Sequence, residues 1–513
     1  MSPYREFRVQ TLDRDITDGI LLDDEGAAIY ETGYGALLLT IIKLNDVATL
    51  NRYLATHPAA PGPGETDRFD AFWAAAYHGS TDALRILLEH YAAHSTQIIA
   101  PDARGFLLLN VACQFAQVDT ARFLLDNHLA AGDIHARDDY GMTALLAAAA
   151  SFFDLAYEEN DKRDLMRDTM ACSEELMLLL LDRGASARDA VTRADEKPRD
   201  TVLTLAISRA SSKLVKRLID EGADVHTKKM HFLNDGSFGG LDTIWDVTPL
   251  HIGSFYSNVE GIQTLLDNRG SGIYIADMVS CCDSFGRHPL HWAAGGPSPL
   301  EFALSNATTT IKLLLTSNPD TVNTQDKQGD TALHYAARSH AQRISKNSDT
   351  LKFLCENGAD ASLRDRKGQT PLHCLCFHAP GSEPIDTSLI PLLLAHGSDI
   401  GDADADGNTP LHLAVKNLQS VEAVQLLLNQ GANVGAKNLI GNTPLHQAAG
   451  GHIWIQEGEL THNDRMRAQD EMMRVLQEAE GNLNLMDQEN AAGKTPRLIR
   501  EERRNRWLGK GPR

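Results

Sequence analysis

Six histidines recur at similar intervals in the second half of the chain, and imidazole can serve as a general acid, a general base or a metal ligand. A catalytic or metal site needs two or three such groups to converge on one point. Each of these histidines instead holds the fourth place of one repeated five-residue phrase, Thr-Pro-Leu-His-x or a close variant of it. The pattern therefore indicates a repeated structural role. The six residues are His251, His291, His334, His373, His412 and His446.

Two other short motifs contain residue types that bind metals or phosphates. Residues 373–378 read His-Cys-Leu-Cys-Phe-His, but side chains so close together on one helix point in different directions, so one zinc ion could not collect them all. Residues 492–495 read Ala-Gly-Lys-Thr, like the end of a phosphate-binding loop, yet Gln488 stands where that loop requires glycine. Outside the repeated phrase the sequence has no Ser/His/Asp set, paired-carboxylate motif or dinucleotide fingerprint. We therefore predict no enzyme activity, no metal site and no cofactor.

The repeated phrase marks the start of a short helix. An Asp-x-x-Gly turn precedes it, as at 326–329, and its glycine suits a positive φ. The threonine then caps the helix, and proline takes the first position, where its missing N–H has no consequence. A second segment carries apolar pairs such as Leu427-Leu428 and ends at a glycine such as Gly431, which is typical of a helix C-cap. We expect two short helices in each unit.

Helices of this length cannot be stable alone. Isolated helices below roughly 12–15 residues are marginal in water, so each unit must bury its apolar stripe against the next one. Small residues such as Ala336-Ala337 allow a neighbouring helix to approach closely. A fully buried Leu-Leu pair contributes about 3–6 kcal/mol before chain entropy is subtracted. The sequence thus predicts a stacked array in which each unit contacts only its neighbours.

With its repeated phrase and paired helices, the chain resembles the ankyrin-repeat family, which has a β-turn and two helices per unit. The resemblance extends from about Tyr34 to the C-terminus and implies an all-α ankyrin-repeat solenoid of about eleven units plus caps. It also implies that the recurrent histidine forms hydrogen bonds within and between turns. The expected divisions are an N-terminal flank or cap (1–33), degenerate repeats (34–227), an inter-repeat insertion (228–246), consensus-like repeats (247–487) and a C-terminal capping unit with a basic tail (488–513).

The first half departs from the repeated phrase. In one unit Asp70 takes the N-cap position and Trp73 the histidine position, and in the next unit residues 107–110 read Leu-Leu-Leu-Asn in place of the phrase. Sequence drift and a specialised partner surface both explain these losses.

Several units also exceed the roughly 33 residues usual for the family. The additional residues are candidate contact elements, although elaboration without function is equally open because long surface loops cost little. The insertion at 228–246 carries Phe232, Phe238 and Trp245. The others, expected between the two helices of a unit, are 151–170, 295–308, 339–349, 379–387 and 451–466.

Composition limits the possible partners and compartments. The formal net charge of −21 over 513 residues disfavours direct binding to nucleic acid. The sequence has no apolar run of the roughly 18–20 residues that a membrane span needs, and residues 1–10 lack the apolar core of a secretory signal. Seven cysteines without a disulfide framework indicate reduced thiols and an intracellular protein, in the cytoplasm, the nucleus or both.

The basic residues between Arg497 and Arg513 have two interpretations. They form a polar capping helix, or they form a nuclear-import patch or a site for an acidic partner.

The resemblance implies that other proteins, of unknown identity, bind at the turn tips and on the exposed side of the first helices. Apolar tip residues are the most suggestive of these, although packing against a neighbouring tip is an equal alternative. The predicted tip residues are Ser284, Phe285, Lys327, Gln328, Arg366, Lys367, Ala405, Asp406, Leu439 and Ile440. The predicted first-helix residues are Arg338, Ser339, Phe377, His378, Lys416 and Asn417.

Our leading functional hypothesis is a non-catalytic adaptor or scaffold that presents an extended protein-binding surface, because repeats occupy almost the whole chain. The alternative is a transcription coregulator that acts through a DNA-binding partner protein, for which the basic C-terminus would suit nuclear entry.

Overall fold

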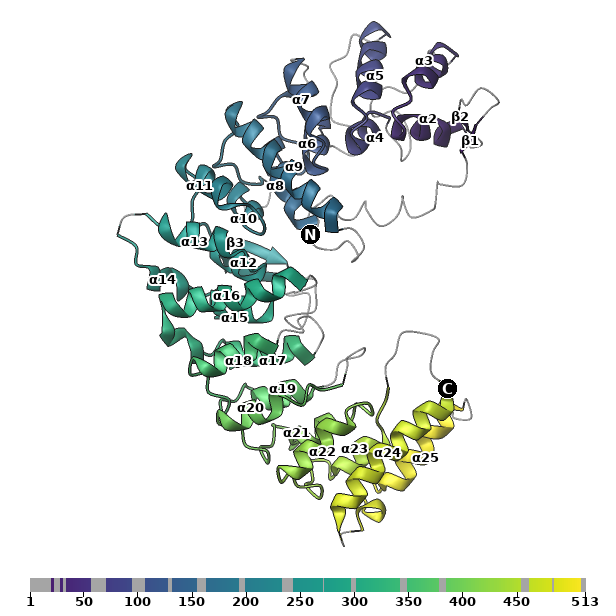
Figure 1. The fold of residues 1–513 in the computed structure, drawn as a ribbon, viewed down its shortest axis with the longest axis vertical. Coiled ribbons are helices and arrows are strands. Elements are labelled where there is room, and N and C mark those ends of the chain that lie inside the picture. Colours follow the sequence, from purple (N-terminus) through teal and green to yellow (C-terminus); the bar gives the residue numbers. More distant parts are fainter. Residues whose placement is uncertain are drawn as a thin grey trace. The chain divides into compact units, whose positions relative to one another are not determined.

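The structure is a computed structural model that shows consecutive pairs of short helices and two small hairpins (Figure 1). Along the described residues we count eleven consecutive helix pairs, one extra short helix between two pairs, and a single last helix. This confirms the predicted all-α stacked-repeat fold. The described residues are 20–22, 28–30, 34–56, 71–94, 107–127, 132–154, 163–192, 199–232, 243–270, 272–296, 301–341, 348–377, 384–453, 461–481 and 484–508.

The chain divides into two compact units. Unit 1 comprises Met1–Asn234, Leu241–Pro249 and Glu260–Gly270, and unit 2 comprises Asp235–Gly240, Leu250–Val259 and Ser271–Arg513. Each unit is described by itself.

In unit 1 the first helices of successive pairs contact one another in the order α2, α4, α6, α8 and α10, and the second helices follow the order α3, α5, α7 and α9. The helices are α2 (Tyr34–Lys43), α3 (Val47–Thr56), α4 (Ala71–His78), α5 (Thr81–His94), α6 (Leu108–Gln114), α7 (Val118–Asp126), α8 (Ala144–Asp154), α9 (Arg163–Asp182), α10 (Val202–Ala206), α11 (Ser212–Asp220) and α13 (Val259–Asp267). The hairpins are β1 (Ile20–Leu22) with β2 (Ala28–Tyr30), and β3 (Lys229–Phe232) with β4 (Thr243–Val247).

In unit 2 the first helices contact one another in the order α15, α17, α19, α21, α23 and α25, and α14, α16, α18 and α20 form a second row. The helices are α12 (Pro249–Phe255), α14 (Ile275–Val279), α15 (Pro289–Gly295), α16 (Glu301–Ser317), α17 (Ala332–Ala341), α18 (Ser348–Glu356), α19 (Pro371–Cys376), α20 (Leu389–Ala395), α21 (Pro410–Ala414), α22 (Val421–Asn429), α23 (Pro444–Ala449), α24 (His462–Glu480) and α25 (Pro496–Trp507). Two 3-10 helices, η3 (Pro319–Asn323) and η4 (Leu485–Asp487), lie between pairs.

The core lies between helices, where small residues and leucines were expected. Ala336 and Ala337 are buried, and so are both members of the pair Leu265-Leu266. In the repeat that contains α22, Leu427 is fully buried whereas Leu428 is only half-buried. The free energy of about 3–6 kcal/mol expected for a fully buried Leu-Leu pair therefore applies to some repeats only. In other repeats one leucine of the pair provides most of the apolar burial.

The insertion expected at 228–246 contains a hairpin that the sequence analysis did not predict. Lys229 pairs with Val247 and Phe232 with Thr243 in an antiparallel register. The Lys229 side chain is almost fully buried and forms an ion pair with Asp200. Phe238 lies outside the described residues.

Part of the additional length expected between helices instead extends the second helix of the pair. Residues 163–170 form the beginning of α9, residues 301–308 belong to α16, and residues 462–466 begin α24. These segments are therefore regular helix, which corrects the expectation that they are loops.

Candidate protein-binding surface

Each recurrent histidine in the later units links its own turn to the next one. The backbone N–H of Thr370 donates to Nδ1 of His373 over 3.2 Å, so this ring nitrogen carries no proton. The proton of the neutral ring is therefore on Nε2, which donates to the carbonyl of Asn408 in the next unit over 3.1 Å. Equivalent bonds between units join His334 to Gln369, His412 to Asn442 and His446 to Lys494.

These hydrogen bonds bear out the histidine role that the family resemblance implied. Burial lowers the pKa of His251, His291 and His334 from 6.5 to about 4. It also lowers the pKa of His373 and His412. A neutral ring with both nitrogens engaged holds two turns together, and this arrangement explains the recurrence without chemistry.

In the degenerate repeats, two other polar residues form part of the hydrogen bonds that the histidine forms elsewhere. Their roles were not predicted from the sequence. Asn110 stands at the histidine position of its unit, and its side-chain amide donates to the carbonyl of Met142 over 2.9 Å and to Asp138 over 3.1 Å. Thr204 instead accepts the backbone N–H of Thr201 over 2.7 Å. The signal available in the sequence was a polar residue in the histidine register.

The metal-like motif is part of the core. Cys374 and Cys376 are buried, and burial raises the pKa of the first thiol to about 11 and of the second to about 12. Within the described ranges, no three His, Cys, Asp or Glu side chains are grouped so that they could hold a metal ion. His378 lies outside the described residues.

The turns are built by their aspartates and glycines as predicted. Oδ1 of Asp326 accepts the N–H groups of Gln328 (2.7 Å) and Asp330 (2.9 Å). Gly329 has a φ of +81°, and a Cβ there would lie 3.0 Å from the backbone nitrogen of Arg366 in the next turn. Glycine is therefore required for its conformation and for the close approach of the next unit.

Successive turns of unit 2 are joined tip to tip by backbone hydrogen bonds. We call the residues at these tips, 284–285, 327–328, 366–367, 405–406 and 439–440, the tip strip. Because their backbone groups bond to one another, the tips have fixed positions relative to their neighbours. The bonds run from N–H to carbonyl from Lys327 to Phe285 (2.8 Å), Arg366 to Gln328 (2.7 Å), Ala405 to Lys367 (2.7 Å), Leu439 to Asp406 (2.9 Å) and Ala491 to Ile440 (3.0 Å).

Most predicted tip residues are exposed. Leu439 is 76% exposed and Ile440 is 58% exposed, so packing against a neighbouring tip does not account for these two side chains. Phe285 is only half-exposed, and the guanidinium of Arg287 lies 5.0 Å from its ring centroid. Phe285 therefore has a contact inside its own repeat. Ser284 is half-buried, and the remaining exposed tip residues are Lys327, Gln328, Arg366, Lys367, Ala405 and Asp406.

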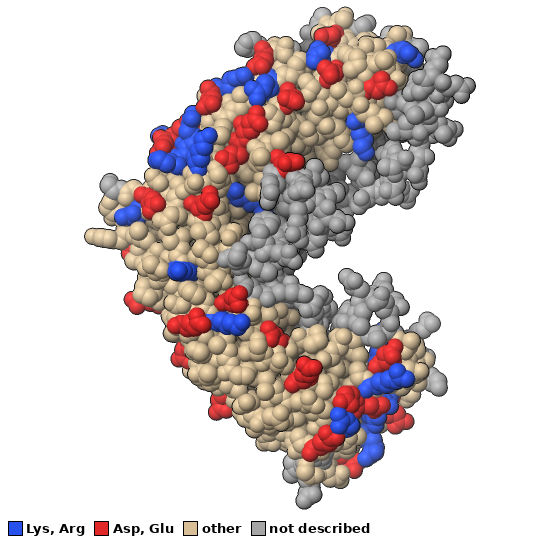
Figure 2. All heavy atoms as spheres, in the orientation of Figure 1, with Lys and Arg blue, Asp and Glu red and all other residues tan. Residues whose placement is uncertain are grey.

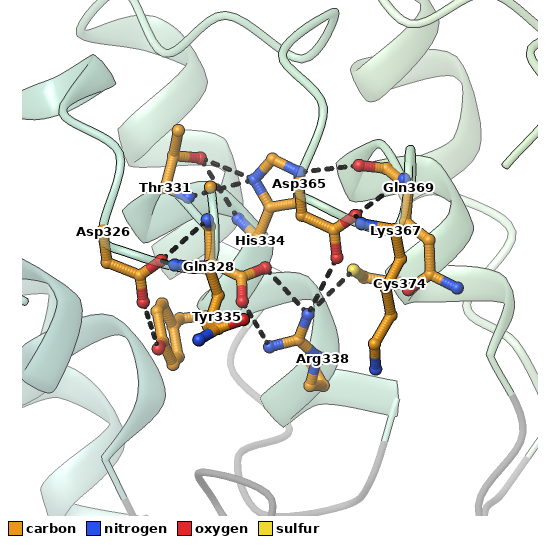
Figure 3. Close-up of polar contacts among 12 residues, drawn as sticks. Asp326, Gln328, Thr331, His334, Tyr335, Arg338, Asp365, Lys367, Gln369 and Cys374 are labelled. Atoms are coloured by element: carbon orange, nitrogen blue, oxygen red, sulfur yellow. Dashed lines mark hydrogen bonds and ion pairs between the residues drawn. The ribbon is translucent and has the colours of Figure 1, made fainter. Parts of the chain in front are cut away.

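Arg338 belongs to a polar network between two neighbouring repeats of unit 2 (Figure 3). Its guanidinium donates to Asp330 over 2.8 Å and to Sγ of Cys374 over 3.5 Å, and it lies 3.9 Å from Asp365. The hydroxyl of Tyr335 in the same helix donates to Asp326 over 2.8 Å. We had predicted a partner-binding role for Arg338, but these contacts engage its charge within the array.

The other first-helix residues differ in exposure. Ser339 and Asn417 are buried, which corrects the expectation that they lie on the exposed side. Phe377 is 45% exposed, and Lys416 is half-buried. Burial lowers the pKa of Lys416, and the nearby carboxylates Asp404 and Asp406 oppose this shift. Phe377 and Lys416 therefore remain candidates.

Comparison with known proteins identifies the repeats. Residues 274–457 match a family described as ankyrin repeats, in the overlapping segments 274–365, 300–385, 339–438 and 382–457. The chain is an ankyrin-repeat protein. Ankyrin repeats generally serve as protein-interaction modules, and proteins built from them are usually non-catalytic.

Individual relatives match only parts of this ankyrin-repeat chain. Inversin from Homo sapiens and Inversin from Canis lupus familiaris are each 29% identical to it over 188 residues. These matches cover 34% of the chain but only 16% of either relative. A solved structure of the ankyrin repeat domain of Bcl-3, a member of the IkappaB protein family, is 25% identical, covers 51% of this chain and 98% of that domain, and has a TM-score of 0.34. Among the described residues, no helix is both long enough and apolar enough to span a membrane.

Proposed function

We propose that this ankyrin-repeat protein is a non-catalytic adaptor or scaffold, and that the tip strip of unit 2 docks a protein partner. The observation that carries the proposal is the exposure of Leu439 (76%) and Ile440 (58%) on adjacent positions of a turn whose backbone is bonded to both neighbouring turns. Covering such side chains is favourable, by up to about 1.5–3 kcal/mol for each one fully buried.

The tip strip changes in character along its length. Lys327, Arg366 and Lys367 provide positive charge at two tips, Asp406 provides negative charge at the next, and Leu439-Ile440 is apolar. Packed helices lie about 8–10 Å apart, and an extended chain advances about 3.3 Å per residue, so a docked segment would place about three residues on each unit. Its preferred order is therefore acidic residues, then a basic residue, then apolar residues.

The backbone bonds between tips favour binding for an entropic reason. A loop that must become ordered on binding loses part of the interaction free energy, whereas a surface that is already fixed loses little. Each tip of this strip is held by an internal turn bond and by a bond to its neighbour. A partner therefore meets side chains whose spacing is set before binding.

The test uses the full chain as bait for affinity purification with quantitative mass spectrometry. We expect the double substitution Leu439→Ser and Ile440→Ser to remove specific partners without shifting the thermal transition, because both side chains are exposed. A matched control replaces Leu498 and Leu508, which are 42% and 41% exposed on and after α25. An unchanged set of recovered proteins from the tip variant, or equal losses from both variants, would contradict the proposal.

The coregulator alternative depended on the basic C-terminus, and the structure gives several of these residues local partners. Arg500 and Arg504 both form ion pairs with Asp470, and Arg497 pairs with Asp487. Figure 2 likewise shows acidic and basic side chains interspersed over α24 and α25. Lys510 and Arg513 lie outside the described residues. Nothing in the part of the chain that the structure describes favours this second function.

A further inference from the structure

Three basic residues from three different segments lie near the last helix, around residues 451–452 or within electrostatic range of Arg503. We call Lys416, Arg465 and Arg503 the basic cluster. Lys416 follows α21, Arg465 lies in the first turn of α24, and Arg503 lies on α25. The backbone N–H of His452 donates to the carbonyl of Lys416 over 3.1 Å, and Nε of Arg503 donates to the carbonyl of Gly451 over 3.2 Å. Residues 451–452 therefore lie between Lys416 and Arg503.

The first turn of α24 completes the arrangement. Arg504, the neighbour of Arg503 in sequence, donates to the carbonyl of Met466 over 3.2 Å and to the side chain of Gln469 over 2.8 Å. These bonds hold α25 against the part of α24 that carries Arg465. The guanidinium of Arg503 also lies 5.7 Å from the ring centroid of Trp507, which orients this cation.

Unlike other cations in this part of the chain, the members of the basic cluster form no ion pair with a carboxylate of the described residues. Arg474 pairs with Glu471 and Glu478, and Lys494 pairs with Glu502. Over the described ranges, no ion pair joins Lys416, Arg465 or Arg503 to an acidic side chain. Asp404 and Asp406 lie near Lys416 without an ion pair to it, and Arg465 and Arg503 form no ion pair with an acidic side chain of the described residues although the formal net charge is −21.

The charges of the arginines near Arg503 repel one another. Burial lowers the pKa of Arg503, and the positive charges of Arg506 and Arg465 lower it further. Burial also lowers the pKa of His452, with additional effects of Arg503 and Lys416. An anion among these side chains would relieve both the repulsion and the incomplete solvation.

We propose that the basic cluster binds an acidic segment of a protein partner, through the carboxylates of two or three Asp or Glu side chains. This inference rests on the proposed function, because Lys416 belongs to the surface predicted to dock partners. Guanidinium groups bind carboxylates with two parallel hydrogen bonds, and two of the three cations are arginines.

A polypeptide fits the cluster better than a nucleic acid. Tight electrostatic binding of DNA involves about 6–10 phosphate contacts, whereas the cluster supplies three cations and Arg506 a fourth nearby. The negative charge on the rest of the chain would repel a long polyanion. A short acidic segment gains the local attraction without extending across the acidic surface.

The test measures binding of a fluorescein-labelled peptide of six glutamates, flanked by Gly and Ser, to the full chain by fluorescence polarisation at low salt. We expect saturable binding that weakens with added salt. The triple substitution Lys416→Gln, Arg465→Gln and Arg503→Gln should weaken binding by at least about tenfold. The control Lys352→Gln, Arg474→Gln and Arg497→Gln changes net charge equally, but its cations already have partners, so binding should weaken by less than about threefold.

Several outcomes would overturn this inference. They are the absence of saturable binding to the wild-type chain, equal losses in the two triple variants, and tighter binding of an equally charged single-stranded oligonucleotide at the same cluster. Arg503→Lys, which keeps the charge but loses the fork of donors, provides a second test: it should bind with intermediate affinity. The peptide assay does not involve Leu439 or Ile440, so its failure is distinguishable from failure of the tip-strip experiment.

Discussion

Acidification from pH 7 to pH 5 should weaken the stacked repeats, because the recurrent histidines must be neutral to form their hydrogen bonds. Nδ1 of His334 accepts the backbone N–H of Thr331 over 3.1 Å, and Nε2 contacts the carbonyl of Gln369 in the next unit over 3.1 Å. A second proton on this ring would place two N–H groups against each other. Protonation therefore breaks the link within the turn and charges a buried ring.

The size of the effect follows from the lowered pKa. A group whose pKa is lower in the folded state contributes stability that is complete above the unfolded value and is lost as the pH falls toward the folded value. For His334 this window runs from 6.5 down to about 4. At pH 5 the unfolded ring is mostly charged and the folded ring mostly neutral, so at about 1.4 kcal/mol per pKa unit the loss relative to pH 7 is about 2 kcal/mol.

The assay is hydrogen exchange with mass spectrometry at pH 7 and pH 5, with intrinsic rates corrected for pH, in peptides covering α17 and α19. Local opening is measured because a long repeat array need not unfold in one step. The variant His334→Gln cannot titrate, so it should be less stable at both pH values but lose about 2 kcal/mol less between them. Asp326 and Asp365, whose pKa values burial raises, act in the opposite direction but are common to both chains. An equal pH dependence in the two chains would refute the reasoning.

Two further predictions concern packing between units. Leu427→Ala should destabilise the surrounding repeats by about 2–5 kcal/mol because Leu427 is fully buried. Leu428→Ala should destabilise them clearly less because Leu428 is only half-buried. Equal losses of protection in hydrogen exchange would contradict this. Gly407→Ala should lower the temperature of the thermal transition more than Gly431→Ala. Both glycines have positive φ, but only at Gly407 would a Cβ meet the next turn, 2.9 Å from the backbone nitrogen of Leu439. Equal shifts would show that φ alone matters.

Much of the fold could be predicted because the repeated phrase determines local structure. The Asp-x-x-Gly turn, the Thr-Pro helix start and the glycine C-cap each fix a few backbone angles, and the structure has helices beginning at Pro371, Pro410 and Pro444 as expected. The hairpin of β3 and β4 was missed because the residues between its strands are rich in glycine and polar residues, which indicate a loop. Its stability comes instead from side chains such as Ile244 and Val247, which are buried in unit 1.

The candidate surface could be predicted less completely, because exposure depends on contacts between units. The repeat register placed Leu439 and Ile440 correctly at an exposed tip, since most tip positions of unit 2 are exposed. It could not show that Arg338 reaches a carboxylate of its own turn and a thiol of the next unit, nor that Ser339 is covered by packing. The contact with Cys374 depends on how the next repeat packs, which no single repeat encodes.

The most direct test of a docking role for unit 2 is a hydrogen-exchange footprint of the full chain, measured with and without a partner recovered by affinity purification. We expect the partner to protect peptides containing the tips at 405–406 and 439–440, together with the peptide containing Lys416. Protection confined to unit 1, or no change at these tips while the partner is bound, would contradict it.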